Sequence, residues 1–385
     1  MRLLAPAVVA ALAACAPHAG PPSHEPPPPT PVTAARAAPP AIPSTILPGA
    51  SAPAAIAPRD SVAQAQDVHA PAAPAAPAAS ATPAGSPRLP PAGPDRGCID
   101  DGAPYDPAAL RAQIAYLASS ELDGRATGTA GDLAARRHVA ERFRCLGLVP
   151  AGEGGYEQPF TADGQPTANL VGYLPGDDAA VGGDIIVVGA HHDHLGAGHL
   201  GANDDASGTA ALLAIAQAVR QHGAPRRTIA FVAFGGEELG LVGSTYFAAH
   251  PPAHLPLDRV VYDINLDMIG SYAEAGAVYA MGTFRGLAAT RIVKALAAAH
   301  PALHVGVGGR GVGSDHEAFC HAGVPYVFFW TPDRRCYHAR CDTIDQLDAG
   351  HAGEIAALAG ALVEQLASST TDLAGARARL GCTGR

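Results

Sequence analysis

Residues 184–223 read DIIVVGAHHDHLGAGHLGANDDASGTAALLAIAQAVRQHG, and this stretch indicates the fold. It begins with a run of apolar, largely β-branched residues, which is typical of a buried strand. A loop rich in histidine, aspartate and glycine follows, and a Ser–Gly pair then opens an Ala/Leu-rich segment with helical spacing. A strand that leads through a polar loop into a helix is the repeating unit of sheets with parallel strands.

The same alternation continues along the chain. Further apolar, strand-like runs occur at 169–174, 227–234, 259–266, 277–282 and 324–330. Helical patterns occur at 106–120, 131–148, 208–223, 287–300 and 352–367. Continuously apolar strands between helices predict the α/β class, with a mainly parallel, mixed central sheet sandwiched by helices. Because polar clusters follow several of these strands, we expect the chemistry at the carboxyl edge of the sheet.

Composition divides the 385 residues into three parts. Residues 1–15 have Arg2, a short apolar run and small residues before Cys15, which is the pattern of an export signal too short to span a bilayer. The sequence LAAC at 12–15 resembles a bacterial lipobox, so we expect a lipid anchor at Cys15 and a cell-envelope location, with plain secretion as the alternative. Residues 16–96 are rich in Pro and Ala and predict a disordered linker, which leaves 97–385 as one folded domain.

Charge and cysteine content narrow the function classes. The net charge is −10 and Lys294 is the only lysine, so a nucleic-acid partner is excluded. Six cysteines remain besides Cys15, and an oxidising compartment permits disulfides. Cys336 and Cys341 flank His338, and we expect a disulfide there rather than a thiolate zinc site. The sequence leaves open how the others pair, which are Cys98, Cys145, Cys320 and Cys382.

The loop after 184–190 contains candidate metal ligands. In an extended chain His191 and Asp193 point to one side and His192 and His194 to the other. A carboxylate on the second nitrogen orients a ligating imidazole, so His191 is the predicted ligand and Asp193 its orienting partner. We interpret the remaining histidines of the loop as bystanders or pocket lining: His192, His194 and His199.

Four other clusters follow strands or precede helices, and each has an ordinary structural explanation. Asp204 and Asp205 precede a helix, where they can act as caps. Glu237 and Glu238 follow the strand at 227–234 and can open a helix. Asp267 lies at the end of an apolar strand, where a salt bridge would also explain a carboxylate. The last candidate is His338, which lies between two cysteines.

Counted together, these groups suit two metal ions. A catalytic zinc ion takes about three protein ligands and leaves a position for water. Five groups provide this if Asp204 bridges, since each ion then has one histidine, one private carboxylate and the shared one: His191, Asp204, Glu238, Asp267 and His338. Glu237 remains without a metal and is the predicted general base.

The chain resembles the di-zinc aminopeptidases of the leucyl-aminopeptidase-like metallopeptidase family, M28. The resemblance covers about residues 105–368 and rests on GAHHDHLG, GANDDASGTAALL, EELGLVGSTYF, INLDMIGS, GSDHEAFCHAGVPYVFF and YHARCDTID, in family order. It implies a zinc-exopeptidase (phosphorylase/hydrolase-like) fold and two Zn²⁺ per chain. His191, Asp204 and Asp267 would hold one ion, and Asp204, Glu238 and His338 the other. It also implies that Glu237 is the base, that Asp193 supports the ligands, and that Tyr337 stabilises the tetrahedral intermediate.

The expected function is therefore hydrolysis of N-terminal residues from peptides with a free N-terminus, by a monomer that touches a membrane only through Cys15. One departure from the family is Asp205, where asparagine is usual. The alternatives are a carboxypeptidase, a dipeptidase or a glutaminyl cyclase of the same fold. Arg310 in the Gly-rich segment GGRGVG is a candidate partner for a substrate carboxylate. A non-catalytic binding role would entail loss of a ligand or of Glu237, and all are present.

Overall fold

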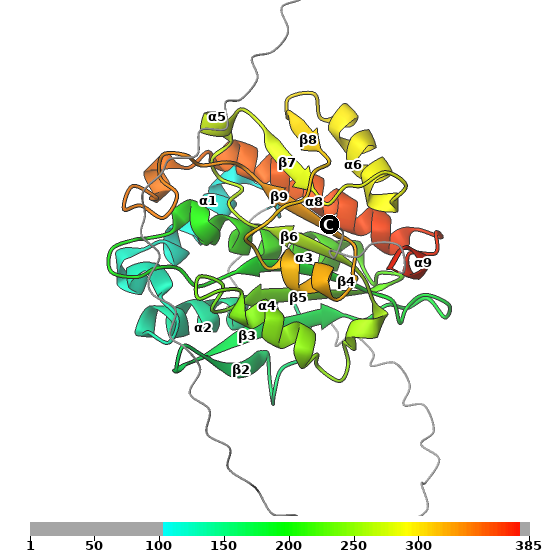
Figure 1. Ribbon diagram of the computed structural model, residues 1–385, viewed down its shortest axis with the longest axis horizontal. Coiled ribbons are helices and arrows are strands. Elements are labelled where there is room, and N and C mark those ends of the chain that lie inside the picture. The colour runs from blue at the N-terminus through cyan, green and yellow to red at the C-terminus, as the bar shows by residue number, and fades with distance from the viewer. Residues whose placement is uncertain (1–102, 378–385) are drawn as a thin grey trace, which may run out of the picture. The chain divides into compact units, whose positions relative to one another are not determined.

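The computed structural model describes residues 103–377. The predicted signal at 1–15 and the linker at 16–96 lie outside the described residues, as do Cys98 and Cys382. Within 103–377, Figure 1 shows a central sheet with helices on both of its faces. No helix in this range is long and apolar enough to cross a membrane.

The strands of this range form one nine-stranded sheet in the order β1-β3-β5-β4-β6-β9-β7-β8, with β2 paired to β3. Its four central strands, β5, β4, β6 and β9, run parallel, whereas β3 and β7 pair with them in antiparallel fashion. The strand bounds are β1 Val149–Pro150, β2 Glu157–Ala162, β3 Gln165–Leu174, β4 Ile185–His191, β5 Thr228–Phe234, β6 Val260–Leu266, β7 Val278–Met281, β8 Val305–Val307 and β9 Tyr326–Trp330. The mainly parallel, mixed sheet is thus parallel in its centre, and its antiparallel pairings lie toward the edges.

Helices cover both faces, as the continuously apolar strands require. Side chains of α2, α3, α6 and α8 pack against one face, and those of α4 and α7 against the other. Figure 1 shows helices on both faces of the sheet. Every residue of β4, β5 and β6 is buried. The helix bounds are α1 Pro107–Leu117, α2 Ala130–Cys145, α3 Gly208–His222, α4 Val242–Ala249, α5 Tyr272–Ala275, α6 Ala288–Ala299, α7 His316–His321, α8 Ala349–Ser368 and α9 Ala374–Arg377.

The longer predicted elements are confirmed. All five predicted helices form, and Asp106 caps α1 by accepting the N–H groups of Ala108 and Ala109. All six predicted strands form as well. The elements that the sequence did not indicate are mostly short, such as β1, β8 and α5, and such pieces contain too few residues to show a periodic pattern.

A buried arginine holds together the loops at the carboxyl edge of the sheet. Arg125 ends a short 3₁₀ turn, Ser120–Arg125, and its guanidinium is fully buried. It donates hydrogen bonds at 2.6–2.9 Å to four backbone carbonyl oxygens, those of Leu117, His192, Leu200 and Gly201. Two of these carbonyls lie in the loop that follows β4 and one directly precedes the segment Ala202–Ser207. The conformation of the candidate site therefore depends on a side chain that does not enter it.

Candidate metal centre

Four neighbouring parallel strands bring the predicted residues to one edge of the sheet. His191 is the last residue of β4, and Asp267 directly follows β6. Glu237 and Glu238 come after β5, and His338 lies in the loop after β9. Since β5, β4, β6 and β9 are adjacent and parallel, their carboxyl ends meet, as predicted.

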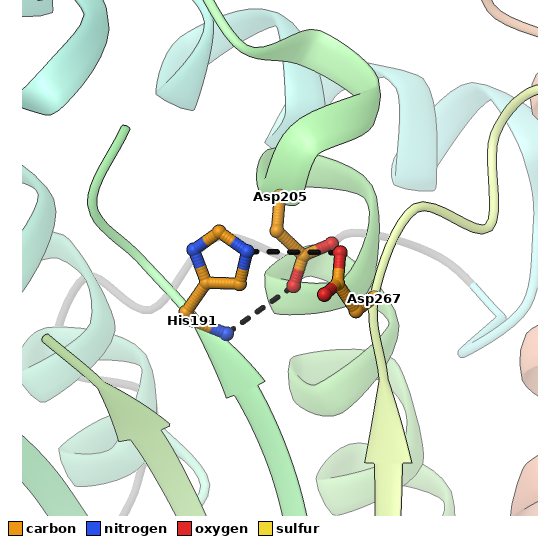
Figure 2. Close-up of side chains that lie close together, drawn as sticks. All are labelled: His191, Asp205 and Asp267. Atoms are coloured by element: carbon orange, nitrogen blue, oxygen red, sulfur yellow. Dashed lines mark hydrogen bonds and ion pairs between the residues drawn. The ribbon is translucent and has the colours of Figure 1, made fainter. Parts of the chain in front are cut away.

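The first half of the site is centred on His191, which is buried. Its Nε2 atom lies 3.2 Å from Asp204 Oδ1 and 3.6 Å from Asp267 Oδ1. Figure 2 shows His191 and Asp267 facing each other across the ends of their strands. Burial lowers the pKa of His191, but four surrounding acids, Glu237, Asp267, Asp193 and Asp204, together outweigh burial and hold that pKa well above its usual value.

The second half of the site is centred on His338. Its Nε2 atom lies 3.2 Å from Asp204 Oδ2 and 3.1 Å from Glu238 Oε2. Asp204 thus presents one oxygen to His191 and the other to His338. The chain brings together all five predicted ligands, with Asp204 between the two histidines.

The loop that carries His338 is fixed at two points. A disulfide joins Cys336 to Cys341, as predicted. Next to it, the buried carboxylate of Asp342 accepts the N–H groups of Asn203 (2.7 Å) and Asp204 (3.0 Å), which ties this loop to the Asp204 segment. These two attachments hold the loop around His338. His338 itself has φ 53°, in the left-handed region that non-glycine residues seldom adopt.

Glu237 lies beside the ligands. Its Oε2 atom is 4.0 Å from His191 Nε2, and its backbone N–H donates to Asp193 Oδ1 at 3.1 Å. In the protein alone, burial raises the pKa of Glu237 to about 10, and the charges of Asp315 and Asp267 add to this shift while His191 opposes it. A carboxyl group with this pKa is protonated at neutral pH, so the role of general base requires nearby positive charge, such as that of metal ions, to favour the carboxylate.

Asp193 is fully buried between its neighbours. Its Oδ1 atom lies 3.7 Å from His191 Nδ1, and its Oδ2 accepts the hydroxyl of Thr127 at 2.9 Å. The backbone oxygen of Asp193 is closer to His191 Nδ1, at 3.2 Å. Asp193 therefore holds both His191 and the backbone of Glu237, which is wider support than the sequence indicated.

The carboxylate of Asp205, the residue that departs from the family pattern, accepts hydrogen bonds from the backbone. Its Oδ2 accepts the N–H of His191 (3.2 Å), and its Oδ1 accepts those of Gly208 (2.8 Å) and Met268 (3.1 Å). Figure 2 shows Asp205 beside His191 and Asp267, where these three could together hold an ion. Because three backbone donors engage its oxygens, we assign Asp205 to support of the strand ends and Asp204 to the ligand set.

The interpretation of His194 as a bystander or part of the pocket lining is incomplete. His194 is buried, and its Nδ1 atom lies 2.7 Å from Glu238 Oε1. The alternation that places it away from His191 does not hold here, because β4 ends at His191. His192 does point elsewhere, with Nε2 3.1 Å from the carbonyl oxygen of Ala168, and His199 contacts the carbonyl oxygen of Gly196.

A cavity of about 360 Å³ opens onto these residues. Its polar lining includes His191, Asp204, Glu237 and His338. Its lining also includes four apolar side chains and one exposed cation, which are Met281, Phe328, Trp330, Val312 and Arg310. Tyr337 also lines the cavity, and its ring stacks on that of His338 at 3.9 Å between centroids.

The donor set fits metal ions better than it fits a hydrogen-bond network. Asp204 Oδ2 and Asp267 Oδ1 are buried and accept no hydrogen bond from any residue in 103–377. Such atoms cost about 1–3 kcal/mol each unless another partner satisfies them. Imidazole nitrogens and carboxylate oxygens are preferred ligands of Zn²⁺.

Comparisons with known proteins identify the family. A sequence model of peptidase family M28 matches residues 169–363. Leupeptin-inactivating enzyme 1 of Streptomyces exfoliatus is 30% identical over 262 residues, which cover 61% of this chain and 56% of that protein. Aminopeptidase YwaD of Bacillus subtilis is 32% identical over 174 residues, which cover 43% of this chain and 37% of that one. The chain thus spans about half, or less, of the length of these curated relatives.

The fold has counterparts among solved structures. The zinc aminopeptidase BSAP from Bacillus subtilis superposes with a TM-score of 0.59 at 19% identity, covering 71% of this chain and 98% of that chain. This similarity supports the α/β fold and its mixed sheet. The family match covers the strands and loops that carry all five clustered ligands and Glu237. The chain belongs to peptidase family M28.

Proposed function

We propose that this protein is a monomeric aminopeptidase that uses two zinc ions to hydrolyse the N-terminal residue from peptides. The observation that carries the proposal is the placement of Asp204, whose two oxygens face two histidines 3.2 Å away on either side. Each histidine has a further carboxylate of its own, Asp267 or Glu238, within 3.6 Å. This arrangement supports two three-ligand sites that share one carboxylate.

The names of the similar proteins support the same reading. The curated relative YwaD is called an aminopeptidase, and the structural neighbour BSAP is described as a zinc aminopeptidase. When bound, the two ions would lower the pKa of a water molecule and polarise the carbonyl of the scissile bond. Held between Asp204 and the private carboxylates, they would be partly neutralised by the chain's own charges.

The residues of this chain supply the proton transfers. Glu237 lies beside the ligands without belonging to either set, and with the ions bound its carboxylate would take the proton from the attacking water. The same carboxyl group then delivers the proton to the nitrogen of the leaving peptide. Tyr337 also lines the cavity, and we assign its hydroxyl as the donor of a hydrogen bond to the oxygen on which negative charge develops.

The free amino group of a substrate is a cation, and this cavity has carboxylates close to the reacting centre. Glu237 and Asp267 line it together with Asp204. One observation favours a second candidate, a carboxypeptidase, because the exposed cation of Arg310 also lines the cavity. The two functions differ in the substrate end that they need, and a direct assay separates them.

The test compares three substrates in the presence of zinc: leucine p-nitroanilide, its N-acetylated form, and an N-acetylated peptide with a free carboxylate. We expect the substrate with the free amine to be cleaved with a kcat/KM at least about 10²-fold higher than that of either blocked substrate. The reason is that a site with buried polar groups rejects an analogue that leaves them unpaired. Faster cleavage of the blocked peptide would identify a carboxypeptidase instead.

A variant pair checks the assigned base. Glu237→Ala should lower kcat by about 10²–10⁴-fold, the range of general base catalysis, and retain both metal equivalents. Glu354→Ala, on the exposed face of α8, is the matched control and should retain wild-type activity. Near wild-type turnover of Glu237→Ala would refute the assignment of the base.

We also propose that Cys15 carries a lipid anchor and that the protein is exported to the cell envelope. The proposal rests on the short apolar run and the LAAC sequence at 12–15, which lie outside the described residues. Labelled palmitate should be incorporated by the full-length chain and not by Cys15→Ser. Equal labelling of both chains, or none of either, would contradict it.

A further inference from the structure

His194 contacts the side chain of a proposed metal ligand, although the sequence places it among the bystanders. Its Nδ1 atom lies 2.7 Å from Glu238 Oε1, whereas His338 Nε2 lies 3.1 Å from the other oxygen, Oε2. The two oxygens of Glu238 therefore face different histidines. His194 Nδ1 is farther from Asp204 Oδ2, at 3.9 Å, so Glu238 is its partner.

We infer that His194 is a positioning residue for Glu238. Its Nδ1–H donates to Oε1, which leaves Oε2 as the oxygen that binds the metal ion shared with His338. The inference rests on the proposed pair of ions. A ligating carboxylate with one oxygen held in a hydrogen bond loses rotational freedom before the ion arrives, so less of the binding free energy is spent on ordering it.

The surroundings of the ring favour this tautomer. His194 Nε2 is buried and has no hydrogen-bond partner among residues 103–377. A buried N–H without an acceptor is costly, so the proton belongs on Nδ1, where Glu238 accepts it. The second nitrogen then carries only a lone pair.

The backbone holds the ring in place from two sides. The N–H of His194 donates to the carbonyl oxygen of Arg125 at 3.3 Å. Gly201, with φ 62°, packs against the ring so closely that a Cβ atom there would lie 2.6 Å from His194 Cγ and Cδ2. This close approach requires glycine and restricts the ring to one orientation.

Consecutive residues thus support the two halves of the centre. Asp193 lies against the His191 half and His194 against the Glu238 half. His192, from the same tetrapeptide, is equally buried but contacts the carbonyl oxygen of Ala168 and no proposed ligand. It provides a matched control for replacement of a buried histidine.

The experiment titrates zinc into the metal-free protein in competition with a chelator and resolves the two equivalents. His194→Phe should weaken one equivalent by about 10–100-fold, the usual effect of losing a hydrogen-bond partner of a metal ligand, and leave the other within a few-fold of wild type. His192→Phe should lower the melting temperature without changing either equivalent.

Two further variants keep the test decisive if the phenylalanine variant does not fold. The amide of Asn reaches the position of Nδ1, and the amide of Gln extends toward that of Nε2. His194→Asn should bind both equivalents within a few-fold of wild type, and His194→Gln should show the weakened equivalent. Equal affinities for Asn and Gln, or equal weakening of both equivalents, would overturn the inference. If the wild type bound fewer than two equivalents, the proposed pair of ions would fail instead.

Discussion

Replacing Arg125 with methionine should lower both the stability of the protein and the affinity of its metal centre for zinc. The buried guanidinium donates at 2.6–2.9 Å to four backbone carbonyl oxygens, which methionine would leave without a donor. Each buried carbonyl oxygen without a donor costs about 1–3 kcal/mol, so the four together could lower the unfolding free energy by at most about 12 kcal/mol. Folding of the methionine variant does not require a charged group to be desolvated, and this offsets several kcal/mol of that loss. We therefore expect the unfolding free energy to fall by about 3–5 kcal/mol.

The assay is urea unfolding with saturating zinc and with a chelator. The matched control is Arg227→Met, because Arg227 is also fully buried and donates to the carbonyl oxygens of Leu366, Ser369 and Thr371, far along the chain from the site. Both variants should lose stability in the chelator. Only Arg125→Met should also lose part of the stabilisation that zinc gives, by about 1.4 kcal/mol for each tenfold loss of affinity.

Two results would refute this reasoning. One is that Arg125→Met has the same unfolding free energy as the wild type in the chelator, which would mean that the hydrogen bonds of Arg125 contribute no net stability. The other is an equal response of both arginine variants to zinc, which would mean that Arg125 supports the fold without organising the loops of the centre.

Three further predictions concern the loop of the second half and the buried acids. Tyr337→Phe should lower kcat by about 10²-fold or more with little change in KM, as measured with leucine p-nitroanilide, if its hydroxyl meets the developing charge. Burial raises the pKa of Asp263 well above its unfolded value, so the unfolding free energy should fall as pH rises above about 4, by up to about 1.4 kcal/mol per unit. Asp263→Asn, unfolded by urea in a chelator, should therefore match the wild type at pH 4 and exceed its stability at pH 8; a constant difference would contradict this. Replacing both Cys336 and Cys341 with serine should weaken one zinc equivalent in a titration, and unchanged affinities would show that the loop is rigid without its disulfide.

The sequence predicted the centre of the fold because burial on both faces makes each central strand a continuous apolar run. β4, β5 and β6 are buried along their whole length, so their ends, and the polar residues that follow them, were easy to locate. Three of the candidate ligands were found for the same reason. His191, Glu238 and Asp267 lie at or near the point where an apolar run gives way to polar residues, whereas Asp204 was found before a helix and His338 between two cysteines.

Other features had no comparable signal. The two-residue alternation used for the histidine loop applies only inside a strand, and β4 ends at His191, so it misplaced His194. Arg125 occurs in a polar segment that gives no sign of a buried guanidinium with carbonyl partners distant in sequence. Asp204 and Asp205 are adjacent and chemically alike, and the structure separates their roles, because two histidines face the oxygens of Asp204 and three backbone donors engage those of Asp205.

The central claim is that Asp204 is shared by two metal ions, and zinc titration of single-site variants tests it most directly. The wild type should bind two equivalents. Glu238→Ala and Asp267→Ala should each weaken a different one, because each carboxylate faces a different histidine. Asp204→Ala should weaken both, since its oxygens lie 3.2 Å from both histidines. One equivalent in the wild type, or an Asp204→Ala variant that loses only one, would contradict the account.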